Sequence, residues 1–160
     1  MTRTGAPIEM AWFAALCDDD YEQLGVVDEQ LLSSPEHCGD IVRAADQSGF
    51  DSILMPSGYA LGIDTVTFTA AIASSTRNIR PIVAVRMGEV WVPTLARQLA
   101  TLDHLLNGRL IINVISSEMP GETLDAESRY QRTYEHMTAL RTLLDGGRLQ
   151  VDGEWLGVDV

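Results

Sequence analysis

The chain has 160 residues, 46% of them hydrophobic and 21% charged, which suits one globular domain with a buried core and excludes a disordered tail. Its 23 acidic and 11 basic residues give a net charge of −12, which argues against nucleic acid or an anionic membrane as a partner, because phosphate binding needs a basic patch. Small-molecule or protein partners are expected instead.

The chain contains two cysteines, Cys17 and Cys38, and no CxxC pair. It shows no signal-peptide pattern and no apolar stretch long enough to span a bilayer. We therefore expect a cytoplasmic protein with reduced thiols.

The first fifty residues predict a strand, a loop and a helix. Residues 8–16 form a short apolar run, which an acidic, irregular stretch follows. Ser33 to Glu36 has the form of a capping box, Pro35 fits the first helical turn, and Gly49 ends the helical pattern.

The same order of apolar run and helical pattern then repeats. Residues 50–58 predict a second strand, and residues 64–75 a helix in spite of their β-branched side chains. Residues 79–88 predict the third strand, residues 93–108 the third helix, and residues 107–118 the fourth strand.

A fourth helix is predicted at residues 126–147, and a hairpin that turns at Asp152-Gly153 follows it. Strand and helix units in succession favour an α/β fold with a parallel sheet and helices outside it. An open doubly wound sheet and a β/α barrel both fit this alternation. The absence of GxGxxG after the first strand weakens the dinucleotide-binding interpretation, and four strands are only half of a barrel.

Asn113 lies inside the apolar run of the fourth strand, which otherwise reads as fully buried. A buried amide must find hydrogen-bond partners or cost about 1–3 kcal/mol. The amide is therefore either bonded within the fold or available to a ligand, and the pattern alone leaves both open.

Several segments, in order, resemble the bacterial luciferase-like flavin monooxygenases, and within them the alkanesulfonate monooxygenase branch. They are WF at Trp12, AADQSGFDSILMPSG, RPIVAVRMG, PTLARQLATLDHLLNGRLIINVISS and SRYQRTYEHM. The resemblance implies the N-terminal half of a TIM-type β/α barrel, about four β/α units over residues 1–160 that end within a hairpin insertion.

The resemblance also implies a chemistry in which the cofactor carries the difficult step. A separate flavin reductase supplies reduced FMN (FMNH2), O2 reacts with it, and one oxygen atom goes to a small organic substrate. In the alkanesulfonate branch this releases sulfite and leaves an aldehyde.

Three candidate residues follow from matching family positions. Asn113 is expected beside the flavin ring, against the alternative of a core amide bonded to a loop. Ser57, in "MPSG", is expected near the flavin; the alternative is a turn serine at the end of the strand. Glu122 is expected near the cofactor; the alternative is a solvated acidic residue of the loop.

Arg129 and Tyr130 match an arginine-tyrosine pair at the start of the fourth helix. The arginine is expected to hold an anionic group, and the tyrosine to present its ring and hydroxyl to the flavin. The alternatives are a surface arginine paired with an acid and a tyrosine packed on the barrel wall. Ala84 and Val85 match a position where the family often has a strained peptide, with ordinary core as the alternative.

The chain departs from the alkanesulfonate branch in three places. Cys17 stands where that branch has a histidine, Leu61 stands where it has a cysteine, and the loop between Ser117 and Ser128 is shorter. The sulfonate substrate is therefore in question. His37, His104 and His136 all fall in predicted helices, and none is assigned to catalysis.

The main hypothesis is part of a two-component FMNH2-dependent monooxygenase, inactive as this chain alone and completed by a homo-oligomer or a separate C-terminal half. Two alternatives remain. One is a non-catalytic half barrel that pairs with another chain, and the other is an oxidoreductase that uses the deazaflavin coenzyme F420. No metal site is expected.

Overall fold

The structure is a computed structural model, and it describes residues 8–17, 26, 30, 33–59 and 62–160. The predicted alternation of strands and helices is confirmed, although β1 is shorter than the apolar run that predicts it. The elements are β1 (Ala11–Phe13), α1 (Pro35–Gln47), β2 (Ser52–Met55), α2 (Thr65–Ile72), the 3-10 turn η1 (Ala73–Ser75), β3 (Arg80–Arg86), α3 (Val92–Leu105), β4 (Ile111–Ile115), α4 (Ala126–Leu144), β5 (Gln150–Asp152) and β6 (Gly157–Asp159).

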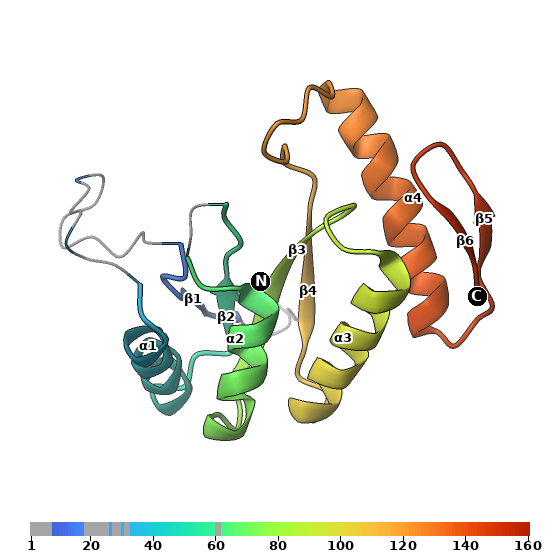
Figure 1. Ribbon diagram of the computed structural model, residues 1–160. Coiled ribbons are helices and arrows are strands. Elements are labelled where there is room, and N and C mark those ends of the chain that lie inside the picture. Colours follow the sequence, from blue (N-terminus) through green and yellow to red (C-terminus); the bar gives the residue numbers. More distant parts are fainter. Residues whose placement is uncertain (1–7, 18–25, 27–29, 31–32, 60–61) are drawn as a thin grey trace, which may run out of the picture.

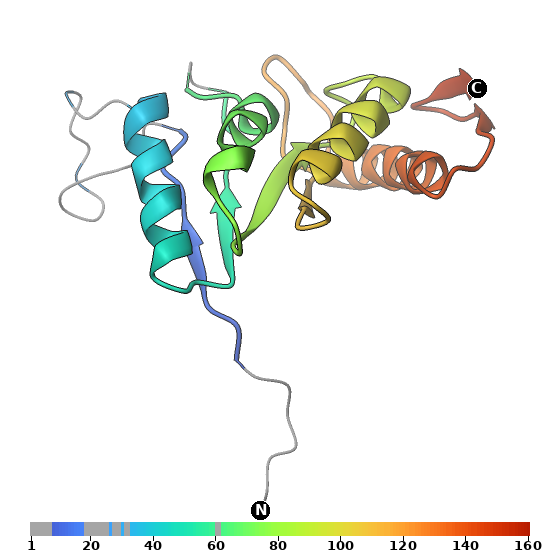
Figure 2. The same ribbon diagram turned by 90° about the horizontal axis from the view of Figure 1, so that it is seen from below.

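The first four strands form one parallel sheet in the order β1-β2-β3-β4. Helices α1 to α4 follow one another in the same order along the sheet, and the β5–β6 hairpin lies beyond α4 (Figure 1, Figure 2). A doubly wound sheet reverses its strand order and carries helices on both faces, whereas a barrel keeps the order and one outer helical layer. The arrangement is that of part of a β/α barrel.

The core lies between the sheet and the helices. Ile53, Met55, Val83 and Val85 of the strands pack in one cluster with apolar side chains of all four helices. Because side chains alternate along a strand, the residues between these four point to the opposite face. We call that opposite face of the sheet the open face.

The open face explains why β4 differs from its prediction. Every residue of β4 is partly exposed, so the expectation of a fully buried strand is wrong for the described chain. Ile112 and Val114 pack against the core, whereas Ile111 and Asn113 belong to the open face. The apolar composition of β4 therefore suits two covered faces, of which the described residues cover one.

Helix α1 begins one residue later than its capping pattern suggests. Ser34, not Ser33, is the N-cap, and its hydroxyl accepts a hydrogen bond of 3.1 Å from the His37 amide. Pro35 then occupies the first turn, as predicted. The hydroxyl of Ser33 donates instead to the carbonyl of Ala15, which links α1 to the chain after β1.

Asp46, in the last turn of α1, organises the amino ends of the strands. Its carboxylate accepts hydrogen bonds from the backbone amides of Arg77, Asn78 and Ile79, at 3.0, 2.9 and 2.7 Å. Burial raises the pKa of Asp46, but the three amides and the charge of Arg109 together outweigh it, and the net shift is downward. This contact holds α1 to the chain that enters β3.

The predicted hairpin is confirmed as the antiparallel pair β5–β6, in which Val151 lies opposite Val158. Its connection is longer than a two-residue turn. The Glu135 carboxylate of α4 accepts hydrogen bonds from the amides of Glu154 and Trp155, at 3.3 and 3.0 Å, so the connection is attached to α4. Among the described residues, no helix is long and apolar enough to cross a membrane.

Candidate active site

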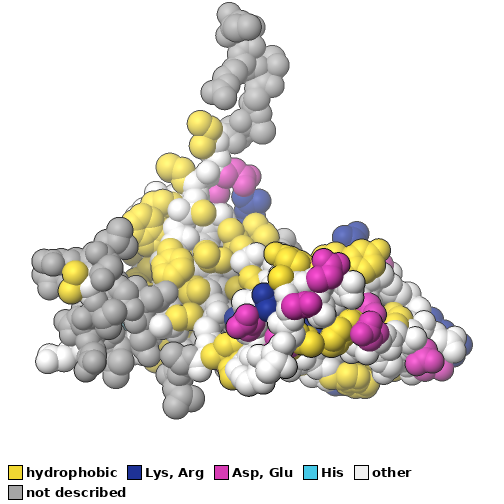
Figure 3. All heavy atoms as spheres, turned by 90° about the horizontal axis from the view of Figure 1, so that it is seen from above, with side chains coloured by type: hydrophobic (Ala, Val, Ile, Leu, Met, Phe, Trp, Pro, Cys, Tyr) yellow, Lys and Arg dark blue, Asp and Glu magenta, His cyan; other side chains and the backbone are white. Residues whose placement is uncertain are grey.

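A cavity of about 310 Å³ lies at the carboxyl ends of β1, β2 and β3, and we call it the edge cavity. Active sites of β/α barrels lie at this end of the strands. Cys17 follows β1, Ser57 follows β2, and Ala84 with Arg86 ends β3, and all four line the cavity. Viewed onto this end, hydrophobic side chains gather beside a group of charged ones (Figure 3).

Arg86 is the one cationic side chain that lines the edge cavity in the described chain, and its side chain is only 4% exposed. Its Nε donates to the Ser117 hydroxyl at 2.9 Å, and its Nη2 approaches the Ser57 carbonyl at 3.4 Å. The guanidinium carbon lies 4.1 Å from the centre of the Tyr59 ring. Arg86 thereby connects the chain after β2 with the chain after β4.

The position of Tyr59 beside Arg86 affects the pKa of its hydroxyl. Burial raises the pKa of Tyr59, and the charge of Arg86 opposes that rise. The tyrosine therefore stays protonated at neutral pH and offers a ring face to the arginine.

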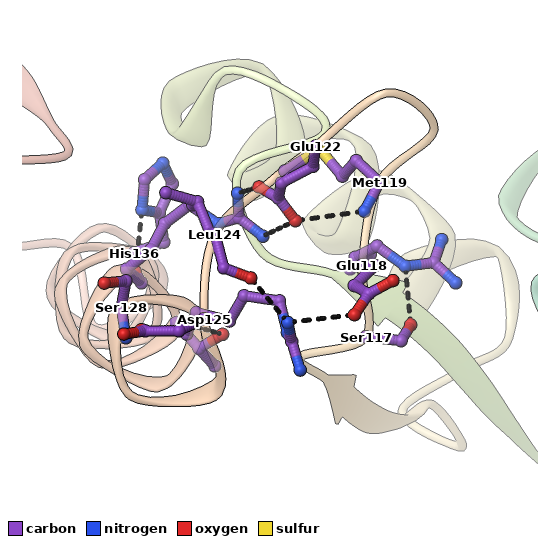
Figure 4. Close-up of polar contacts among 12 residues, drawn as sticks. Ser117, Glu118, Met119, Glu122, Leu124, Asp125, Ser128 and His136 are labelled. Atoms are coloured by element: carbon purple, nitrogen blue, oxygen red, sulfur yellow. Dashed lines mark hydrogen bonds and ion pairs between the residues drawn. The ribbon is translucent and has the colours of Figure 1, made fainter.

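Two further arginines hold the loop between β4 and α4 (Figure 4). Arg129 donates to the Glu118 carboxylate at 3.1 Å and to the Leu124 carbonyl at 2.8 Å. Arg132 forms a two-point ion pair with Glu122, whose Oε2 also accepts a hydrogen bond of 3.1 Å from the Met119 amide. The hydrogen bond from Arg132 is the main reason why the pKa of Glu122 is lowered.

These contacts show the protein partners of two candidates, Glu122 and Arg129. Glu122 is not a solvated loop acid, because Arg132 and Met119 use its carboxylate. Arg129 is paired with an acid, Glu118, which its alternative allows. Contact of either residue with a cofactor stays a prediction.

Asn113 lies directly opposite Ala84 across β3 and β4, two residues before β4 ends. Within the described residues its side-chain amide makes no hydrogen bond, so these residues include no loop partner of the kind that the alternative requires. The amide is partly exposed on the open face and is available to a ligand.

The remaining candidates lie after β2, on β3 and on α4. Ser57 lines the edge cavity and engages Arg86 through its carbonyl, so that its hydroxyl remains available. Tyr130 is 64% exposed on α4 and is not packed on the barrel wall. The peptide bond between Ala84 and Val85 is trans and belongs to a regular strand. Leu61 lies outside the described residues.

A family model of the luciferase-like monooxygenases matches residues 10–159. The chain belongs to this family. Its relatives include a sulfoquinovose monooxygenase of Novosphingobium aromaticivorans, 54% identical over 92% of this chain and 42% of the relative. A second, of Agrobacterium fabrum, is 49% identical over 91% of this chain and 38% of that relative. The chain thus spans about two fifths of the length of these relatives.

Solved structures of luciferase-like and related monooxygenases share the fold. EDTA monooxygenase from Chelativorans sp. BNC1 has a TM-score of 0.77 at 17% identity, over 95% of this chain and 46% of its own. The oxygenating constituent of 3,6-diketocamphane monooxygenase from Pseudomonas putida, solved in complex with FMN, has a TM-score of 0.72 at 18% identity, over 96% of this chain and 44% of its own. Both support the partial-barrel architecture.

Two arginines of this site, Arg86 and Arg132, are not among the residues that the sequence predicts. Arg86 was detectable, because it is the one charge that directly ends the apolar run "PIVAV". Arg132 was not, because its partner lies ten residues earlier in a loop of no regular pattern. The three histidines lie in helices as predicted, and the described residues include no group of three potential metal ligands.

Proposed function

We propose that this chain carries the flavin-binding end of a reduced-FMN-dependent monooxygenase whose substrate is a sulfonated sugar. The observation that carries the proposal is the side-chain amide of Asn113, which makes no hydrogen bond among the described residues and belongs to the open face, two residues before β4 ends. Relatives that are 54% and 49% identical and are named sulfoquinovose monooxygenases support the substrate class.

The described residues fit a flavin. An isoalloxazine ring offers carbonyl oxygens and ring nitrogens along one edge and apolar carbon along the other. The Asn113 amide would bond the polar edge, since it can both donate and accept, and Ala84 beside it leaves room for a flat ring. The Ser57 hydroxyl would serve as a second polar group at the edge cavity. The exposed side chain of Tyr130 would have to move to contact the flavin.

When bound, reduced FMN supplies the two electrons with which O2 is activated. In the overall reaction the C–S bond breaks, the carbon that carried the sulfonate becomes an aldehyde, and one oxygen atom of O2 becomes its carbonyl oxygen. The sulfonate leaves as sulfite, the second oxygen atom becomes water, and the flavin ends oxidised. The chain would contribute position and exclusion of water.

The proposal includes two kinds of partner. A flavin reductase would supply reduced FMN, and further strands, from a C-terminal half or a second copy, would cover the open face. That face carries partly exposed apolar side chains next to Asn113. Covering it would also enclose the flavin and remove water from the site.

The test is to measure binding of reduced FMN under anaerobic conditions and then, with O2 and sulfoquinovose, the release of sulfite. We expect one sulfite per reduced flavin consumed, in the complete assembly of the chain with the partner that covers the open face. A parallel titration with deazaflavin coenzyme F420 tests the hydride-transfer alternative. Binding of F420 without binding of reduced FMN would contradict the proposal.

A further inference from the structure

Arg86 is buried, and no carboxylate of the described residues forms a hydrogen bond with it. A buried charge is costly unless an opposite charge and hydrogen bonds compensate it. Its described hydrogen-bond partners are the Ser117 hydroxyl and the Ser57 carbonyl, and its planar face rests on Tyr59. All three are neutral. They fix the guanidinium in place but carry no negative charge, so the Glu89 carboxylate is the nearest opposite charge among the described residues.

The carboxylate nearest to Arg86 belongs to Glu89, on the same turn after β3. Its Oε2 lies 3.5 Å from Nη1, and Nη1 makes no hydrogen bond although it is completely buried. The Glu89 side chain is 40% exposed, whereas that of Arg86 is 4% exposed. The acid is therefore the movable member of the pair and the arginine the fixed one.

The two arginines of the β4–α4 loop provide a comparison within the same edge. Arg129 and Arg132 each donate a hydrogen bond to a carboxylate, Glu118 and Glu122 respectively. Arg86 has no such bond among the described residues, although it is as deeply buried as Arg132. The other acid at the edge cavity, Asp64, caps α2 by accepting the Thr67 amide at 2.7 Å and is not available to Arg86.

We propose that Arg86 is a preorganised site for the oxyanion group of a ligand in the edge cavity, and that Glu89 is the counter-ion which this group displaces. A sulfonate or a phosphate presents several acceptor oxygens to a guanidinium, as the fork of Arg86 requires. The shared chemistry is a tetrahedral oxyanion on an organic molecule. Only the source of that oxyanion, substrate sulfonate or cofactor phosphate, rests on the proposed function.

The experiment follows the arginine Nε–Hε signals by NMR while methanesulfonate or inorganic phosphate is added to the chain in its assembled form. We expect the Arg86 signal to shift and saturate. Arg86→Gln should weaken binding about tenfold or more, because charge-assisted hydrogen bonds are lost. Arg86→Lys, which keeps the charge but not the fork, should retain part of the affinity.

Glu89→Gln is the decisive variant, because it removes the competing carboxylate and leaves the contacts of Arg86 with Ser117, Ser57 and Tyr59 in place. It should strengthen binding of the probes by about threefold or more, since the oxyanion no longer displaces a charge. Glu127→Gln, an equal change of charge in the first turn of α4, is the control and should leave the affinity unchanged. A gain in Glu89→Gln remains measurable even if Arg86→Gln fails to fold.

Unchanged affinity in Glu89→Gln, or a saturating shift at another arginine, would overturn the proposal. Comparison of FMN with riboflavin separates the two sources: a gain for FMN alone identifies the phosphate, and a gain for methanesulfonate alone identifies the substrate. If the assembled chain binds neither flavin but methanesulfonate still shifts Arg86, the proposed function fails and the oxyanion site stands.

Discussion

Glu122 and Arg132 form an ion pair whose side chains are only 10% and 7% exposed, and it joins the loop after β4 to the second turn of α4. The turn after β3 packs against the same arginine. A Cβ on Gly88 would lie 2.9 Å from Cδ of Arg132, and the φ of this glycine is +95°, so a side chain is excluded there for two reasons. The loops after β3 and β4 are thus held together at the carboxyl edge.

This ion pair leads to the first prediction. Glu122→Gln should lower the thermal stability at neutral pH, because Arg132 is left buried without its carboxylate. The pKa of Glu122 is lowered from its ordinary value of 4.5, chiefly by the hydrogen bond from Arg132. The pair therefore stabilises the fold above about pH 4.5, and this contribution is lost as the pH falls through the lowered pKa. Melting curves of both proteins should converge in acid. A constant difference between them would contradict this.

The second prediction concerns the opposite end of the sheet. Asp46→Ala removes the acceptor of three backbone amides and should destabilise the fold by about 1–3 kcal/mol. Affinity for reduced FMN should not change in the protein that remains folded, because Asp46 lies at the amino ends of the strands. Asp40→Ala, which removes an exposed ion pair with Arg43, is the matched control and should cost little. Denaturant unfolding measures both.

The third prediction assigns Asn113 to binding rather than stability. Asn113→Ala should weaken reduced FMN binding by about 1–3 kcal/mol, because a polar flavin edge loses its partner. Stability should change little, since the amide makes no hydrogen bond within the described residues. Asn113→Leu, which restores volume without polarity, should bind as poorly as the alanine variant. Recovery of affinity in the leucine variant would mean that shape, not the amide, is what matters.

Local signals account for what the sequence predicted well. Each of the four α-helices begins at a side-chain cap or a proline, such as Asp64 or Pro93, and the strands are apolar runs between such signals. The one-residue error at Ser33 arose because two adjacent serines both suit a cap, and only the tertiary contact with Ala15 separates them. The barrel arrangement followed from the family resemblance, because the alternation of strands and helices also fits a doubly wound sheet.

The candidate site was less predictable because it depends on contacts between distant residues. The bonds from Arg86 span 29 and 31 residues, and no local pattern encodes them. The burial of β4 was misjudged for a similar reason. An apolar strand indicates that both of its faces suit burial, but it does not indicate which chain segment covers each face.

The last prediction follows from the open face. Phe13, Leu54, Ile82 and Ile111 form one row across the four strands in register, and Phe13 is 41% exposed. Leaving apolar area in water forfeits roughly 25 cal/mol for each Å², and unpaired strand edges invite further pairing. The 160-residue chain on its own should therefore self-associate at low micromolar concentration or pair with a chain that completes the barrel.

Sedimentation should show that Ile82→Thr together with Ile111→Thr shifts the chain toward monomer, because both substitutions reduce the apolar area of the row. The control is Tyr134→Thr on α4, which removes a side chain that is 67% exposed but lies away from the open face. If association instead proceeds through α4, Tyr134→Thr would dissociate the chain and the double variant would not. A compact monomer that melts cooperatively and binds no hydrophobic dye would show that the open face needs no cover, and the partial-barrel account of β4 would then be wrong.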